Sequence, residues 1–132
     1  MTFDKFTIKA QETVQAAVFI AQRNGQQTIE PVHLLAGLLD KAKDVMSFLF
    51  QKLGVNAQQV ETLVNSEILH LPKVQGGEPY FSPDANKVLI QAQDISQRLG
   101  DEFVSVEPLL VALLKVSSTA SRIMKDAGIN EK

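Results

Sequence analysis

The residues that could carry catalysis or hold a ligand stand apart from one another in this sequence. No Gly-x-x-x-x-Gly-Lys-[Ser/Thr] phosphate-binding loop occurs, since the paired Gly76-Gly77 precedes Glu-Pro instead of a lysine. His33 and His70 belong to no His-Glu-x-x-His motif and the chain has no cysteine. We interpret both as helix-start or surface histidines, not as metal ligands. No serine lies in a Gly-x-Ser-x-Gly elbow. We therefore predict no catalytic residue, bound cofactor or metal in this chain.

The composition is that of an ordinary soluble globular protein. Apolar residues make up 45% of the chain and charged residues 21%, and the formal net charge is −2. Domains that bind nucleic acid usually carry a basic excess, which is missing here. No apolar stretch is long enough to cross a bilayer, and the first residues lack the pattern of a secretory signal. We predict a cytoplasmic domain that binds neither nucleic acid nor membrane.

The sequence repeats itself with an offset of 75 positions. Phe6-Thr7 falls on Phe81-Ser82, and Gln22-Arg23-Asn24-Gly25 falls on Gln97-Arg98-Leu99-Gly100. Two prolines and two glycines lie between Leu71 and Tyr80, which predicts a loop between the halves. The predicted organisation is one domain, 1–132, with a first repeat at about 6–70, a linker loop at 71–80 and a second repeat at about 81–132.

Each half is predicted to fold as helices. Thr7 and Ser82 are good N-cap residues for the first helix of each half, and Gly25 and Gly100 are expected to end these helices. In the first half, further helices are expected from Pro31, over about 44–53 and over about 57–69. In the second half, they are expected after Ser105 and over about 119–127. The Leu-Leu-x-x-Leu-Leu runs are too apolar for surface helices and are predicted to form the centre.

The second half is expected to form its own fourth helix after Asn130. Because the sequence stops at Lys132, we interpret the second repeat as truncated at its last helix and expect a longer protein. The predicted fold class is all-α, with seven or eight helices in two pseudo-symmetric four-helix repeats that pack into one compact domain without a strand of consequence.

Several stretches resemble the double-repeat N-terminal domain of the Clp chaperones, which are AAA+ unfoldases and disaggregases. They are Phe6-Thr7-Ile8-Lys9-Ala10-Gln11-Glu12, Ile29-Glu30-Pro31-Val32-His33-Leu34-Leu35, Leu53-Gly54-Val55-Asn56, Leu71-Pro72-Lys73-Val74 and Gly100-Asp101-Glu102-Phe103-Val104-Ser105. The resemblance covers nearly the whole chain. The Leu-Pro-x-Val linker and the Glu-Pro-x-His-Leu helix start are most similar to the ClpB branch.

This resemblance implies a recruiting role. Such domains sit on a tether above a hexameric ATPase ring and hold exposed apolar segments of unfolded or aggregated proteins, or dock an adaptor protein. ATP and Mg²⁺ would bind in ATPase domains outside this chain, and a DnaK-type chaperone would act on the ring's middle domain. The chain itself would be monomeric, and the full-length protein a homohexamer. The alternatives are adaptor docking, as in the ClpA and ClpC branches, a stand-alone protein with its own ligand, and a passive spacer.

The resemblance also implies substrate-binding residues. The family's apolar groove maps to Gln91, Ile95 and Pro108, and because only Ile95 keeps a large aliphatic side chain, the groove is expected to shift toward Val88 and Ile90. Polar positions linked to substrate handling match Thr7, Asp101 and Glu107. Thr7 and Glu107 also suit helix starts, which leaves Asp101 least explained by structure. Phe19 points away from its helix's apolar stripe, and we interpret it as packing against the other half.

Overall fold

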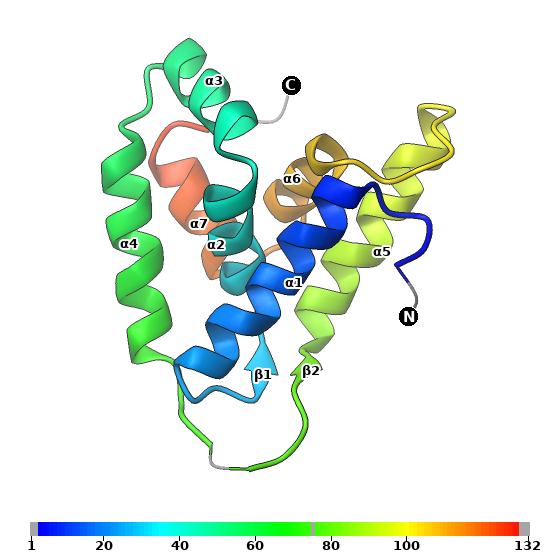
Figure 1. Ribbon diagram of the computed structural model, residues 1–132. Coiled ribbons are helices and arrows are strands. Elements are labelled where there is room, and N and C mark those ends of the chain that lie inside the picture. Colours follow the sequence, from blue (N-terminus) through cyan, green and yellow to red (C-terminus); the bar gives the residue numbers. More distant parts are fainter. Residues whose placement is uncertain (1–2, 75, 130–132) are drawn as a thin grey trace.

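The computed structural model describes residues 3–74 and 76–129, and these residues form seven helices and one pair of two-residue strands (Figure 1). The helices are α1 (Ile8–Arg23), α2 (Pro31–Lys41), α3 (Lys43–Leu53), α4 (Ala57–His70), α5 (Pro83–Arg98), α6 (Val106–Lys115) and α7 (Thr119–Asp126). The strands are β1 (Thr28–Ile29) and β2 (Tyr80–Phe81). The predicted all-α class is confirmed. The helix predicted after Asn130 lies outside the described residues.

The first helices of the two repeats begin and end at equivalent positions. The Thr7 hydroxyl accepts the Ala10 N–H at 3.2 Å, and the Ser82 hydroxyl accepts the Ala85 N–H at 3.0 Å. Gly25 and Gly100, with φ of 70° and 77°, follow the last turns in left-handed conformation. Both helices therefore have 16 residues, and the 75-position offset of the sequence also describes the structure.

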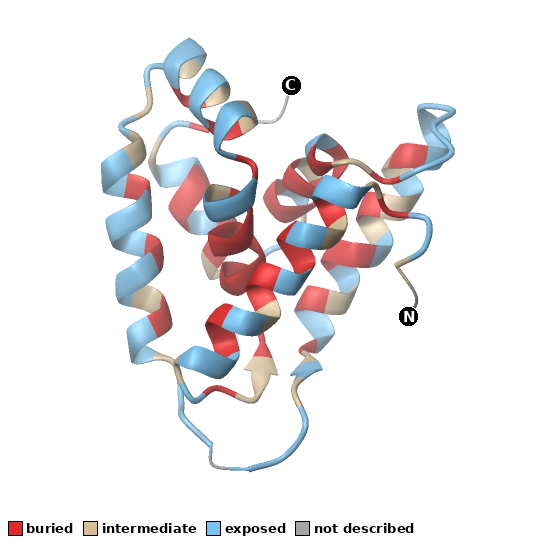
Figure 2. Ribbon diagram, in the orientation of Figure 1, coloured by how far each residue is buried: buried red, intermediate tan, exposed pale blue. Residues whose placement is uncertain are grey.

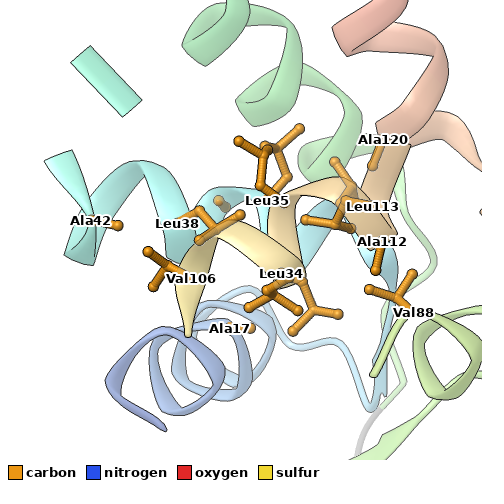
Figure 3. Close-up of a cluster of buried hydrophobic side chains, with 14 of the residues drawn as sticks. Ala17, Leu34, Leu35, Leu38, Ala42, Val88, Val106, Ala112, Leu113 and Ala120 are labelled. Carbon is orange, nitrogen blue, oxygen red and sulfur yellow. The ribbon is translucent and has the colours of Figure 1, made fainter. Parts of the chain in front are cut away.

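The second helix of each repeat lies at the centre of the molecule. Leu34, Leu35 and Leu38 of α2 are fully buried, and Leu109 and Leu113 of α6 match them. Figure 3 shows Leu34, Leu35 and Leu38 beside Leu113 in one cluster. Buried positions concentrate on these central helices, whereas α3 and α4 turn broad exposed faces outward (Figure 2).

Small residues allow α1 and α2 to pack closely. Gly37 lies against the backbone of Thr13 and Ala17, so that a Cβ at position 37 would overlap the Thr13 carbonyl oxygen. Ala17 is fully buried at this crossing. The small residues on this face of α1 therefore serve close helix packing.

Short extended segments of the two repeats pair with each other. β1 of repeat 1 pairs in parallel with β2, just before α5, and places Ile29 opposite Phe81. In the equivalent place, Phe6 pairs with Val104 in a parallel bridge. Each repeat thus pairs the residues before its first helix with the residues before the other repeat's second helix. This pairing was not predicted from the sequence, since two-residue strands are too short to show an alternating pattern.

A buried polar network joins the start of α2 to the end of α4. Nδ1 of His33 accepts the Glu30 N–H at 2.9 Å, so its Nε2–H donates to the Gln26 side-chain oxygen at 2.8 Å. The Gln26 amide in turn donates to the Ile68 carbonyl oxygen at 2.6 Å. Burial lowers the pKa of His33 to about 4. His33 is therefore a neutral helix-start residue with both ring nitrogens in use.

Candidate functional site

The structure brings three of the predicted polar site residues to one end of the molecule. The Thr7 N–H donates to the Val104 carbonyl oxygen at 2.9 Å, which holds the start of α1 against the turn between α5 and α6. Asp101 and Glu107 lie exposed three residues before and three residues after Val104. The bridge between Phe6 and Val104 therefore positions all three side chains along one edge.

Exposed apolar side chains lie on the same segments. Ile8 is 76% exposed, Leu99 is 66% exposed and Phe103 is 44% exposed. Lys5 Nζ lies 5.9 Å from the Phe103 ring centroid, which is within the range of a cation–π contact. We call Leu99, Asp101, Phe103 and Glu107, together with Thr7 and Ile8 from the start of α1, the repeat-2 surface. It combines uncovered hydrocarbon with carboxylates, the arrangement expected where another chain binds.

Ile8, Leu99 and Phe103 are not among the residues predicted from the sequence, although the repeat contains a signal for two of them. At the 75-position offset, Leu99 falls on Asn24 and Phe103 falls on Thr28. An apolar residue where the equivalent position of the other repeat is polar is not required by the shared fold. Such differences between repeats mark candidate binding residues.

The predicted residues on α5 and α6 divide into accessible and buried ones. Ile90 is half exposed, and Gln91 and Ile95 are half-buried with one side toward solvent. Val88 is fully buried, and Pro108 is buried as well. Val88 and Pro108 therefore pack inside the molecule and offer no side chain to a partner, while a binding role for the other residues stays a prediction.

The interpretation that Phe19 packs against the other half is wrong, because 60% of this side chain is exposed. It lines a groove of about 300 Å³ on the outer face of α1. We call this the repeat-1 groove, lined by Phe3, Gln11, Val14, Gln15, Val18, Phe19, Gln22 and Phe81. A larger groove of about 660 Å³ lies between α1, the end of α2 and α4, and its lining includes Arg23, Asp40, Lys43 and Glu61.

In the part of the chain that the structure describes, no helix has the length and apolar character needed to cross a membrane. The same residues contain no group of three His, Cys, Asp or Glu side chains placed to hold a metal ion.

The model of the Clp repeat N-terminal domain matches residues 5–127. The chain belongs to the Clp N-terminal domain family. This Clp N-terminal domain is 54% identical, over all of its 132 residues, to the chaperone protein ClpB of Bacteroides thetaiotaomicron. It spans only 15% of that relative's length. The predicted resemblance to the ClpB branch is confirmed.

Solved structures of Clp N-terminal domains share the fold. The N-terminal domain of Hsp104 from Candida albicans superposes with a TM-score of 0.87 at 25% identity, covering 96% of this chain and 84% of that one. The N-domain of ClpV in a complex with a VipB peptide gives a TM-score of 0.77 at 18% identity, covering 95% of this chain and 80% of that one.

Proposed function

We propose that this Clp N-terminal domain recruits clients for a ClpB-type disaggregase by holding exposed apolar segments of unfolded or aggregated proteins. The observation that supports the proposal is the repeat-2 surface, where Ile8 at the start of α1 is exposed, and Leu99 and Phe103 are exposed on the segment that also carries Asp101 and Glu107. Folded proteins expose few large apolar side chains in one place, so this surface favours unfolded chains over native ones. Its carboxylates favour apolar segments that carry basic residues nearby.

Capture at this surface is expected to be weak and tolerant of sequence. Ordering a flexible segment costs conformational entropy, and a shallow surface recovers only part of it. Several domains on one ring would raise the effective affinity through multivalency. The hexameric AAA+ ring, its ATP and Mg²⁺ and the contact with a DnaK-type chaperone are proposals for the full-length protein, because this chain lacks a phosphate-binding loop.

A triple substitution tests this proposal. Ile8→Ser, Leu99→Ser and Phe103→Ser together remove the apolar part of the repeat-2 surface. We expect about tenfold weaker binding of a reduced, carboxymethylated unfolded polypeptide in fluorescence anisotropy, since each side chain contributes buried area in the complex. The matched control is Phe48→Ser, Leu63→Ser and Leu69→Ser, three exposed residues on α3 and α4. Equal losses in both variants, with both folded, would refute the assignment to the repeat-2 surface.

Adaptor docking is the second candidate function, because the ClpV N-domain, which has the same fold, has been solved with a VipB peptide. Two unrelated unfolded polypeptides of equal apolar content separate the two functions. Client capture predicts similar affinities for both polypeptides, since recognition depends on exposed hydrocarbon. Adaptor docking predicts binding of neither, because it requires one defined partner sequence.

A further inference from the structure

We propose that the repeat-1 groove is a second binding site of this domain, for an extended, uncharged apolar segment of an unfolded polypeptide. The inference rests on the proposed client-capture function and adds a separate site on the other repeat. Three observations support this second site: the side chains that line the groove are ordered, the lining is largely apolar, and repeat 2 has different residues at several of the equivalent positions.

The groove is built from ordered aromatic and aliphatic side chains. The Phe3 ring lies edge-on to Phe6 at a centroid distance of 5.0 Å and 6.0 Å from the Phe81 ring. The Gln11 amide donates to the carbonyl oxygens of Phe3 and Phe6, each at 3.0 Å, and so fixes the N-terminal segment beside α1. Val14 is buried beneath these residues. The walls are therefore held in place before any ligand arrives.

The fold does not require this groove to be apolar. At the 75-position offset, Val18 falls on Gln93, Phe19 falls on Asp94 and Phe3 falls on Glu78. At these three positions repeat 2 carries polar and charged residues, whereas Gln15 of the groove falls on the half-exposed Ile90. Val18 is half-buried against the core, whereas the Phe19 ring is 60% exposed and gains most when a partner covers it.

The lining specifies the chemistry of the occupant. Of the residues that the structure describes, none with an ionisable side chain lines the groove, and the polar ones are three glutamines, Gln11, Gln15 and Gln22. Within the described residues, the Gln15 and Gln22 side chains are exposed and make no hydrogen bond. Side-chain amides both donate and accept, so they can pair with the peptide groups of an extended chain. A charged segment would lose hydration against this lining, because Arg23, whose guanidinium lies over the Phe19 ring, lines the larger groove and not this one.

The dimensions favour a short extended segment over a helix or a folded surface. Gln15 and Gln22 are seven residues apart on α1, which corresponds to about 10 Å along the helix axis. Extended chain advances about 3.3 Å per residue, so the two amides bracket about three residues. The groove volume of about 300 Å³ lies at the lower end for ligand pockets. It has room for one or two large side chains. The groove of about 660 Å³ shares Gln15 and Phe19 with this one, but its other lining residues include charges of both signs.

Two phenylalanines give a matched pair of variants for the test. Phe19 has the Arg23 guanidinium 5.6 Å from its ring centroid, and Phe48 on α3 has Lys52 Nζ at 5.8 Å in the same i, i+4 arrangement. Phe48 is 67% exposed, so both substitutions remove a solvent-facing ring and leave the core intact. The probe is the acetylated and amidated nonapeptide Gly-Ser-Gln-Phe-Val-Leu-Gln-Ser-Gly, titrated into the 132-residue chain and followed by NMR.

We expect peptide-dependent shifts at Val14, Val18 and Phe81, a loss of affinity of about fivefold in Phe19→Ala and no loss in Phe48→Ala. Replacing the peptide's central Val with Glu is expected to weaken binding at the groove further. Shifts confined to the repeat-2 surface would overturn the second site and leave client capture standing. No binding at either surface would overturn both proposals. Shifts at the groove that depend on protein concentration and not on peptide would identify a second copy of the chain as the occupant and refute the proposal.

Discussion

At the scale of single residues, His33 shows how one buried ionisable side chain links local structure to pH. Its ring accepts a hydrogen bond at Nδ1 and donates one at Nε2. Protonation would place a second donor against the Glu30 N–H and would put a charge into the core. Burial therefore lowers the pKa of His33 to about 4 in the folded state, against 6.5 in an unfolded chain.

The first prediction concerns stability against pH. Between pH 6.5 and about 4 the unfolded state binds a proton at His33 that the folded state does not bind. Neutral His33 therefore contributes fully to the free energy of unfolding above pH 6.5. This contribution, about 3 kcal/mol, is lost as the pH falls from 6.5 to about 4. Urea unfolding over this range measures it. In His33→Gln the side chain cannot titrate but still suits the helix start, so the free energy of unfolding is expected to fall less over this pH range. Parallel plots of unfolding free energy against pH for the two proteins would contradict the prediction.

The second prediction separates structural from binding roles at Thr7. Thr7→Ala and its repeat-2 equivalent Ser82→Ala each remove a helix cap, and each is expected to cost about 1 kcal/mol in thermal unfolding. Thr7→Ser keeps the capping hydroxyl and is expected to restore stability. If Thr7→Ser still weakens binding of unfolded polypeptide, the side chain contacts the client directly; unchanged binding would show that Thr7 acts only as a helix cap.

At the scale of elements, the sequence contains enough information to place the start of every described helix within two residues, because caps mark the starts, and left-handed glycines mark several of the ends. Thr7, Ser82, Gly54 and Gly128 are such markers. The site is harder to predict. Helical periodicity separates buried from exposed faces, yet it could not show that Phe19 remains uncovered while Pro108 is buried. Those outcomes depend on how the two repeats pack against each other.

The third prediction concerns the crossing of α1 and α2. In an exposed helix, Gly→Ala usually stabilises by about 1 kcal/mol. At Gly37 the added Cβ would overlap the Thr13 carbonyl oxygen, so Gly37→Ala is expected to destabilise by about 2 kcal/mol in urea unfolding. Ser47→Ala, on the exposed side of α3, is the control and is expected to stay within about 0.5 kcal/mol of the parent. A stabilised Gly37→Ala variant would contradict the close packing of α1 against α2 at this residue.

At the scale of the whole molecule, the pairing of extended segments between the repeats makes the folding of each repeat depend on the other. The Ser82 N–H donates to the Ile29 carbonyl oxygen at 3.0 Å, and the Val104 N–H donates to the Lys5 carbonyl oxygen at 2.8 Å. The leucines of α2 and α6 also share one cluster (Figure 3). Separating the repeats would expose this cluster and leave strand groups unpaired.

The fourth prediction follows from this mutual dependence. A cut between Gly76 and Gly77 falls in the exposed linker, where chain breaks are best tolerated. Fragments 1–76 and 77–132 are each expected to lack cooperative thermal unfolding alone, and to regain helical circular dichroism and cooperativity when mixed. Cooperative unfolding of either fragment alone would show that the repeats are independent domains.

The central claim is that this Clp N-terminal domain holds unfolded chains through exposed apolar side chains, and an NMR titration of the labelled chain with a reduced, carboxymethylated polypeptide tests it most directly. The native, folded form of the same polypeptide is the control. We predict shifts at Ile8, Leu99 and Phe103 of the repeat-2 surface and at Val18 in the repeat-1 groove with the unfolded form, and none with the folded form. No shift with the unfolded form, or equal shifts with both forms, would contradict client capture.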